Sequence, residues 1–343
     1  MLKSVLKYFL FAFIFAGLLA AYFLYRIFIS EGVRVTDEKA VITIPHGAVW
    51  QQVKDSIYSN LEIRNKKLFE LVARLKEYPS LIKPGKYVFR KNISYVRFIN
   101  ILRAGEQTPV MVTFNNIRTI YDLAGKVGKQ IEADSAEIAE FLSDPANYSK
   151  DGFTKENIIA VFIPDTYEFY WNTTAEGFYR RMLKEYNRFW NDERKKKAQD
   201  LGLSLIEVSI LASIVDDEVA KPEEKPRIAG VYINRLRRGM PLQACPTIKF
   251  ALNDFSITRI LDKYLEVDSP YNTYKHKGFP PGPIGCPTAE GIDAVLNAEK
   301  HDYLYFAARA DFSGYHNFSR TLAEHNRYAA QYQRELNKRK IYR

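Results

Sequence analysis

The sequence contains few of the residues from which metal sites are built. Its 343 residues include two cysteines and five histidines, and neither cysteine lies in a CxxC or Cys/His spacing. This pattern argues against a structural zinc site. Cys245 and Cys286 each precede a proline. Two free core thiols and, in an oxidising compartment, a disulfide are both compatible with this placement.

Charge is not gathered into one block either. The chain carries 50 Lys and Arg residues against 40 Asp and Glu, a net charge of +10, and the basic residues are spread along its length. No signature of a homeodomain, a zinc finger or an RNA-recognition module accompanies them, which argues against a nucleic-acid partner. A membrane surface or an acidic polymer remains a suitable anionic partner.

The N-terminus holds a long apolar run. The stretch from residue 8 to residue 25 carries no charge, and a helix of about 20 apolar residues spans a bilayer. No A-x-A cleavage site ends the apolar run, so the run predicts an uncleaved membrane helix over residues 8–29 after a cytoplasmic tail of residues 1–7. A cleaved signal peptide is the alternative. Lys3 and Lys7 indicate a cytoplasmic N-terminus and an extracytoplasmic remainder of the chain.

Residues 40–108 predict a small α+β module. We expect a strand in "VITIP", helices in "AVWQQVKDSIYSN" and "KKLFELVARL", a strand after Pro84-Gly85, and a third helix from a Ser94 cap to a Gly105 stop. The segments "IPHGAVWQQVKDSIYSN" and "IKPGKYVF" resemble a LysM-type peptidoglycan-binding module. The module contains no cluster of catalytic residues, so we expect it to bind or to act as a spacer.

Residues 110–343 predict a larger α+β domain. Its expected elements are a strand in "PVMVTF", helices in "TIYDLAGKVGKQI" and "DSAEIAEFLSD", a long basic helix over residues 174–203, a hairpin of "YLYFAA" and "YHNFS", and a closing basic helix. The chain thus predicts an α+β protein with a membrane helix and two extracytoplasmic parts.

Three consecutive acids follow an apolar run in "LASIVDDEVAKPEE". Ser204 and Glu207 form a capping box that starts a helix near Leu205. At about 100° per residue, Glu218 falls within about 20° of the centre of the stripe made by Leu211, Ile214 and Val215. Asp217 lies more than about 100° away on one side, and Asp216 about 140° away on the other. Glu218 therefore occupies a position where a leucine is expected, while its two neighbours face solvent or a rim.

A carboxylate on a buried stripe has two explanations. In the structural explanation, the carboxylate pairs with an arginine such as Arg227 or Arg235, or it lies where the helix frays. In the functional explanation, it is a desolvated acid with a raised pKa that donates a proton near neutral pH. Structural ion pairs are common, and geometry alone favours them. Three acids at a helix C-terminus oppose the helix dipole, however, which favours a functional reason for their presence.

The segments after this helix supply candidate ligand contacts. Asn234 lies in an apolar helical run, and Gln243 lies in the loop "GMPLQACPT". The loop "SPYNTYKHKGFPPGPIGCPT" is rich in proline and aromatic residues, as a binding wall or a structural crossover would be. His316 and His325 are candidate ligands or acid–base groups, although most single histidines are neither.

Several long motifs occur in the order found in one enzyme family. The segments "FIPDTYEFYW", "ASIVDDEVAKPEEKPRIAGVYINRLRRGMPLQACPT", "YNTYKHKGFPPGPIGCP" and "YLYFAARADFSGYHNFSRTLAEHN" resemble the endolytic murein transglycosylases of the YceG-like family. The match runs from about residue 110 to the C-terminus, and the N-terminal anchor and LysM-like segment also lie where that family has them.

The chain departs from the family pattern at three places. The pattern S-I-[VI]-E-[KR]-E reads Ser213 to Glu218 here, with Asp216 for the first acid and Asp217 for the basic residue. Only Glu218 keeps the family's glutamate. Cys245 replaces the aspartate of L-Q-x-D-P-T, and Cys286 replaces a small polar residue. Because both cysteines fall in loops expected near the cleft, we expect a Cys245–Cys286 disulfide.

The resemblance implies a lyase that cleaves the MurNAc–GlcNAc β-1,4 bond within peptidoglycan strands and leaves 1,6-anhydroMurNAc ends, which would terminate strand elongation. Glu218 would act first as acid and then as base, without metal or cofactor. The expected substrate contacts are Asn234, Gln243, Tyr271, Asn272, Tyr274, His316 and Phe318. The resemblance also implies peptidoglycan synthases as partners and placement in the bacterial inner membrane.

Two other functions stay open. A lysozyme-like hydrolase would use Asp216 or Asp217 as the second carboxylate that most glycoside hydrolases need. A non-catalytic wall-binding scaffold would tolerate the loss of Glu218.

Overall fold

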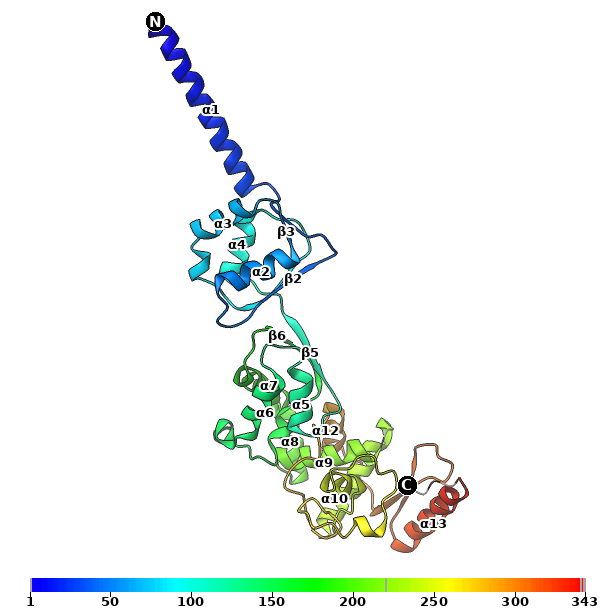
Figure 1. The fold of residues 1–343 in the computed structure, drawn as a ribbon. Helices are drawn as coiled ribbons and strands as arrows, with labels where there is room; N and C mark the ends of the chain where they lie inside the picture. The colour runs from blue at the N-terminus through cyan, green and yellow to red at the C-terminus, as the bar shows by residue number, and fades with distance from the viewer. Residues whose placement is uncertain (1, 220, 340, 342–343) are drawn as a thin grey trace. The chain divides into compact units, whose positions relative to one another are not determined.

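The computed structural model describes residues 2–219, 221–339 and 341. The helices are α1 Leu2–Phe28, α2 Trp50–Asn60, α3 Lys66–Leu75, α4 Tyr95–Ala104, α5 Ile120–Val127, α6 Ser135–Ser143, α7 Ala175–Phe189, α8 Asp192–Leu201, α9 Leu205–Glu218, α10 Lys225–Arg237, α11 Cys245–Ala251, α12 Ala289–Leu296 and α13 Leu322–Lys338 (Figure 1). The strands are β1 Val33–Arg34, β2 Ala40–Ile44, β3 Glu62–Ile63, β4 Gly85–Phe89, β5 Val110–Phe114, β6 Asp165–Phe169, β7 Tyr305–Ala308 and β8 His316–Ser319. The protein is thus a mixed α+β chain, as expected.

The chain divides into two compact units. The first consists of Met1–Val112, Gln130–Ala133 and Tyr167–Thr174, and the second of Thr113–Lys129, Asp134–Thr166 and Ala175–Arg343. The chain crosses between the units within β5 and β6, which pair with each other in a two-stranded sheet.

The first unit has the expected strand–helix–helix–strand order. β2 and β4 pair antiparallel, with Ala40 opposite Phe89 and Ile44 opposite Gly85. The helix α4 follows, with Ser94 as its N-cap and Gly105 in the left-handed conformation at its C-cap (φ 75°). Apolar side chains from both strands and all three helices fill the core, among them Ile42, Ile44, Val53, Ile57, Phe69, Tyr87, Phe98 and Ile99.

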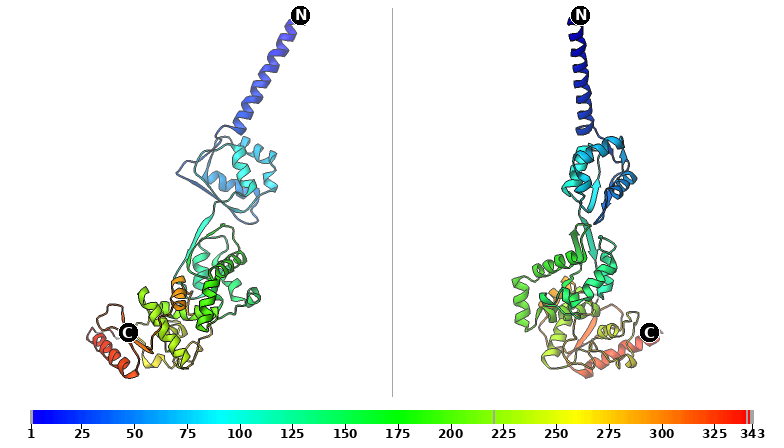
Figure 2. Two further views of the ribbon diagram at one scale, coloured as in Figure 1. Left: turned by 180° about the vertical axis from the view of Figure 1, so that it is seen from behind. Right: turned by 60° about the vertical axis from the view of Figure 1, so that its left-hand side comes forward.

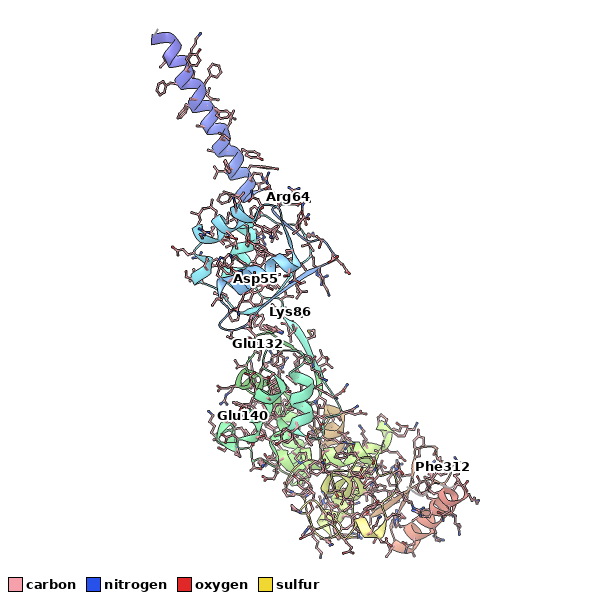
Figure 3. The ribbon with its side chains drawn as sticks, in the orientation of Figure 1. Asp55, Arg64, Lys86, Glu132, Glu140 and Phe312 are labelled. Atoms are coloured by element: carbon pink, nitrogen blue, oxygen red, sulfur yellow. The ribbon has the colours of Figure 1, made fainter. Side chains whose placement is uncertain are left out.

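The apolar N-terminal run forms one helix of the first unit. Within α1, Leu6–Phe28 spans 23 residues with a mean hydropathy of 2.0, which is long and apolar enough to cross a bilayer. Ile27, near the end of α1, packs against the core of the first unit. Residues 130–133 belong to the first unit, and Glu132 among them is labelled in Figure 3. Its carboxylate accepts hydrogen bonds from the backbone N–H of His46 at 2.6 Å and from the His46 ring at 2.7 Å.

The second unit is built around α9. Residues 208 to 215 of this helix are all buried, and α8, α10, α11 and α12 pack against it. The antiparallel β7–β8 hairpin pairs Tyr305 with Ser319 and Ala308 with His316, as its sequence predicts. The basic helix α13 closes the chain at the edge of this unit (Figure 2). There Phe312 contacts Tyr332 at a ring distance of 5.4 Å.

One expectation about helices was wrong. The predicted long helix over residues 174–203 is two helices, α7 and α8, because Trp190 is buried between them and the side chain of Asn191 caps α8 by accepting from the Arg194 N–H. The helix expected in "AVWQQVKDSIYSN" is present as α2 and begins at Trp50, with Val49 at its N-cap.

Candidate active site

The helix that carries the three acids is central to the second unit. Ser204 and Glu207 form the expected capping box, in which the Ser204 hydroxyl accepts from the Glu207 N–H at 3.2 Å and the Glu207 carboxylate accepts from the Ser204 N–H at 2.7 Å. α9 ends at Glu218. Because residues 208–215 of the helix are buried on every side, packing fixes the directions in which the acids point.

Asp216 does not face open solvent, although helical phase placed it towards solvent or a rim. Its side chain is 15% exposed and accepts from Lys225 Nζ at 3.0 Å. It also accepts from the backbone N–H and the hydroxyl of Thr288, both at 2.9 Å. The expectation failed because it assumed a single apolar face, whereas α9 is covered on every side. Asp216 therefore ties α9 to the N-cap of α12.

Asp217 is exposed, as expected, and pairs with an arginine from a distant part of the chain. Both its carboxylate oxygens accept from the Arg118 guanidinium, one of them at 3.2 Å. A cavity of about 330 Å³ opens beside these groups, lined among others by Arg118, Asp216, Asp217, Lys225 and Cys286. The two aspartates are thus engaged with basic side chains at this cavity.

Glu218 has different surroundings from both aspartates. The Tyr232 hydroxyl, from α10, donates to Glu218 Oε1 at 2.7 Å. Lys249 and Asp217 contribute opposing charges, and the backbone N–H of Cys245 also donates to the carboxylate. The residue retains some exposed surface, while its carboxyl group is crowded by protein atoms.

Burial dominates the titration of this carboxyl. Desolvation raises the pKa of Glu218 from 4.5 to about 7, and the hydrogen bond from Tyr232 opposes this rise without cancelling it. A carboxyl with a pKa near 7 exists in both protonation states at neutral pH, so it can donate a proton and take one back. Of the two sequence-based explanations, the geometry favours the desolvated acid, because Arg235 and Arg227 bind other acceptors.

Tyr274 and Cys245 lie beside this acid. The Tyr274 hydroxyl and Cys245 Sγ are 3.2 Å apart. Burial, and next the charge of Glu218, raise the pKa of the Cys245 thiol to about 11. Of the expected contact residues, Tyr274 thus lies next to Glu218, together with Cys245.

The expected disulfide is not formed. Cys245 and Cys286 are both free thiols. Cys245 begins α11, whereas Cys286 is buried in another segment, where its backbone N–H donates to the Ile117 carbonyl at 2.8 Å. The expectation failed because two cysteines in neighbouring loops need not have their side chains directed at each other.

Gln243 is held in place by a buried arginine. Arg235, 6% exposed, donates to the Gln243 side-chain oxygen and to the carbonyls of Pro241 (2.8 Å) and Leu304 (3.1 Å). Gln243 itself adopts a left-handed backbone conformation (φ 52°). Arg235 thereby joins the loop before α11 to the residue that precedes strand β7.

Two asparagines expected to contact substrate have their amides engaged within the protein. The Asn234 amide donates to the carbonyls of His301 at 2.6 Å and Tyr303 at 3.1 Å. Asn272 is fully buried, and its amide donates to the carbonyls of Leu265 and Val267, both at 2.8 Å. Both amide nitrogens stabilise loops through these bonds, and the role of either residue as a substrate contact stays a prediction.

The remaining expected contacts are distributed around the second unit. The ring of Tyr271 packs on Phe250 at 4.7 Å. His316 bonds through Nδ1 to Glu224 at 2.9 Å. Phe318 lies near Phe306, at a ring distance of 6.3 Å. Their role as substrate contacts stays a prediction.

Comparison with known proteins places the chain in a family. The YceG-like family model matches residues 42–331. The chain belongs to the YceG-like family. It is 28% identical over 330 residues to the endolytic murein transglycosylase of Bacillus subtilis, covering 90% of this chain and 89% of that protein. It is also 28% identical over 334 residues to the endolytic murein transglycosylase of Streptococcus pneumoniae, covering 86% of this chain and 60% of that protein.

A solved structure supports the same assignment. The crystal structure of a yceG-like protein from Listeria monocytogenes superimposes with a TM-score of 0.56 at 26% sequence identity, covering 84% of this chain and 98% of that one. In this YceG-like chain, residues 2–219, 221–339 and 341 contain no group of three or more His, Cys, Asp or Glu side chains placed to hold a metal ion.

Sequence reasoning missed the residue that contacts Glu218 most directly. Tyr232 lies in the run "AGVYIN", where a tyrosine is indistinguishable from an ordinary core residue. Its hydroxyl needs a partner because it is buried, and this need is the signal that could have identified it. Arg235 was considered only as a partner of Glu218, but it supports the neighbouring loops instead.

Proposed function

We propose that this YceG-like protein is a peptidoglycan lytic transglycosylase in which Glu218 is the catalytic acid and base. The single observation that carries the proposal is the desolvated carboxyl of Glu218, with its pKa near 7, at the end of a buried helix. The endolytic murein transglycosylases of Bacillus subtilis and Streptococcus pneumoniae, to which this chain is similar, supply the substrate class.

The reaction needs one carboxyl group in two successive roles. Protonated Glu218 donates its proton to the glycosidic oxygen between MurNAc and GlcNAc, and the C1–O bond breaks. Ionised Glu218 then accepts the proton of the MurNAc C6 hydroxyl as its oxygen bonds to C1. The products are a 1,6-anhydroMurNAc end and a free GlcNAc hydroxyl, Glu218 regains its proton, and no water is consumed.

The surroundings of the two aspartates favour this reaction over hydrolysis. A hydrolase of the usual kind needs a second carboxylate as nucleophile or base. Asp216 is bonded to Lys225 and Thr288, and Asp217 is paired with Arg118. Neither aspartate is thus free to act as that second carboxylate without losing partners that hold the second unit together.

The N-terminal parts complete the proposal. The helix α1 acts as a single-pass anchor in the cytoplasmic membrane, with residues 1–7 in the cytoplasm and the rest outside; its length and hydropathy support this placement. Residues 40–108 form a LysM-like module that contacts glycan, and residues 110–343 form the catalytic domain. Cleavage within nascent strands would end their elongation beside a peptidoglycan synthase.

Product analysis tests the reaction. Purified sacculi are digested with the wild-type protein, with Glu218→Gln and with Asp217→Asn as a matched neighbouring control, and the new glycan ends are identified by mass spectrometry. We expect 1,6-anhydroMurNAc ends from the wild type and from Asp217→Asn, and none above background from Glu218→Gln. Equal release of anhydro ends by Glu218→Gln would refute the assignment, and reducing MurNAc ends from the wild type would favour a hydrolase.

A further inference from the structure

Tyr232 is the group whose side chain is directed at the candidate acid from the neighbouring helix. Its hydroxyl lies 2.7 Å from Glu218 Oε1, the length of a strong hydrogen bond to a carboxylate. The tyrosine is 1% exposed, so its hydroxyl is shielded from bulk solvent. We propose that Tyr232 is a positioning residue that holds Glu218 Oε1, so that Oε2 carries the proton exchanged with substrate. This inference rests on the function proposed above.

The tyrosine ring has little freedom to move. Tyr232 lies on α10, and its ring meets Phe306 of β7 edge to face, with the centroids 5.8 Å apart and the planes at 90°. Phe306 is in turn packed against His316, at 5.4 Å. The hairpin thereby fixes the ring, and the ring fixes the hydroxyl. A rigid donor of this kind holds a catalytic carboxyl close to one orientation.

The hydroxyl stays a donor throughout the reaction. Burial and the adjacent charge of Glu218 raise the pKa of Tyr232 well above its ordinary value, so it keeps its proton. An ionised Glu218 accepts this hydrogen bond at Oε1, and a Glu218 protonated on Oε2 still presents Oε1 as a carbonyl acceptor. The bond therefore persists in both protonation states, and the carboxyl does not have to rotate between its two steps.

The bond also has a definite electrostatic effect. A donor to a carboxylate stabilises its charged form and lowers its pKa. The other charged or titratable groups that act on Glu218 are Asp217 on its own helix, Lys249 and Cys245 on α11, and Tyr274 on the long loop. Tyr232→Phe leaves all of these in place and removes a single oxygen, so it isolates the contribution of the hydroxyl.

The test is the pH dependence of kcat/KM for release of anhydro ends from purified glycan strands. Activity needs protonated Glu218 and so falls as the pH rises through its pKa. In Tyr232→Phe we expect this high-pH limb to move upward by about one pH unit and the plateau to fall by about tenfold. The control is Tyr179→Phe, which removes a buried hydroxyl bonded to Asp151 at 2.8 Å in the same unit; its limb should coincide with that of the wild type.

A second variant covers the case in which Tyr232→Phe does not fold. A fluorinated tyrosine incorporated at position 232 keeps the shape of the side chain and donates more strongly, so the limb should move downward. If the high-pH limb of the activity profile is unchanged in the folded variants, the inference is overturned. Glu218→Gln separates the two claims: if it stays active, the proposed function fails, and if it is inactive while the limbs do not move, only the role of Tyr232 fails.

Discussion

Replacing the candidate acid by its uncharged amide should stabilise the protein while abolishing its activity. A pKa of about 7 for folded Glu218 against an ordinary 4.5 means that the folded chain holds an extra proton between these pH values. Stability therefore falls as the pH rises through this window. The ionised carboxyl is worth at most about 3 kcal/mol of destabilisation at pH 8. Glu218→Gln removes this penalty and keeps an oxygen for Tyr232.

The assay is urea unfolding of the wild type and Glu218→Gln at pH 5 and pH 8, followed through the second unit's tryptophan, Trp190. We expect similar unfolding free energies at pH 5. At pH 8 the variant should be more stable than the wild type by about 1–3 kcal/mol. The lower value applies if the hydrogen bond from Tyr232 offsets part of the cost of the ionised carboxyl in the wild type.

Asp217→Asn is the matched control, because Asp217 is exposed and its charge is paired with Arg118. It should lose at most about 1 kcal/mol at either pH, as is typical of an exposed ion pair. If Glu218→Gln gains no stability between pH 5 and pH 8 relative to the wild type, Glu218 is not a desolvated acid and the reasoning is refuted.

Three further outcomes follow from the contacts. Thiol titration of the unfolded protein without reductant should find two free thiols, Cys245 and Cys286. Finding no free thiol would show that the two cysteines form a disulfide. Asn272→Ala should lower the unfolding free energy by about 2–4 kcal/mol, because it removes the hydrogen bonds that a fully buried side chain makes to the carbonyls of Leu265 and Val267. Chemical denaturation measures this loss, and a value below about 0.5 kcal/mol would contradict the role of Asn272. Thr288→Ala should lower the unfolding free energy by about 1–2 kcal/mol, because α12 loses its N-cap and Asp216 loses a partner. The pH at which activity falls should stay unchanged, and a shift in this pH would contradict the separation of Thr288 from Glu218.

Local signals in the sequence were sufficient for much of the fold. The capping box at Ser204, the cap and stop of α4 at Ser94 and Gly105, and the turn between β7 and β8 are encoded in a few neighbouring residues. The break between α7 and α8 was missed because charged residues continue the helical pattern, while burial of Trp190 and capping by Asn191 decide the geometry.

The site was only partly predictable, for a related reason. Helical phase distinguished Glu218 from Asp217, since this depends on one helix alone. The positions of Asp216 and Tyr232 depend on which neighbours cover α9, and a single helix does not contain that information. The same holds for Asn234 and Asn272, whose partners are carbonyls of loops that the sequence pattern does not place.

The central claim is that Glu218 cleaves the glycan without water as a reactant. Digestion of purified sacculi by the wild-type protein in H₂¹⁸O, followed by mass spectrometry of the new ends, tests this claim most directly. We expect 1,6-anhydroMurNAc ends that contain no ¹⁸O from solvent, and we expect these ends to be absent with Glu218→Gln. Reducing MurNAc ends that carry ¹⁸O would contradict it, because they would show that water attacks C1.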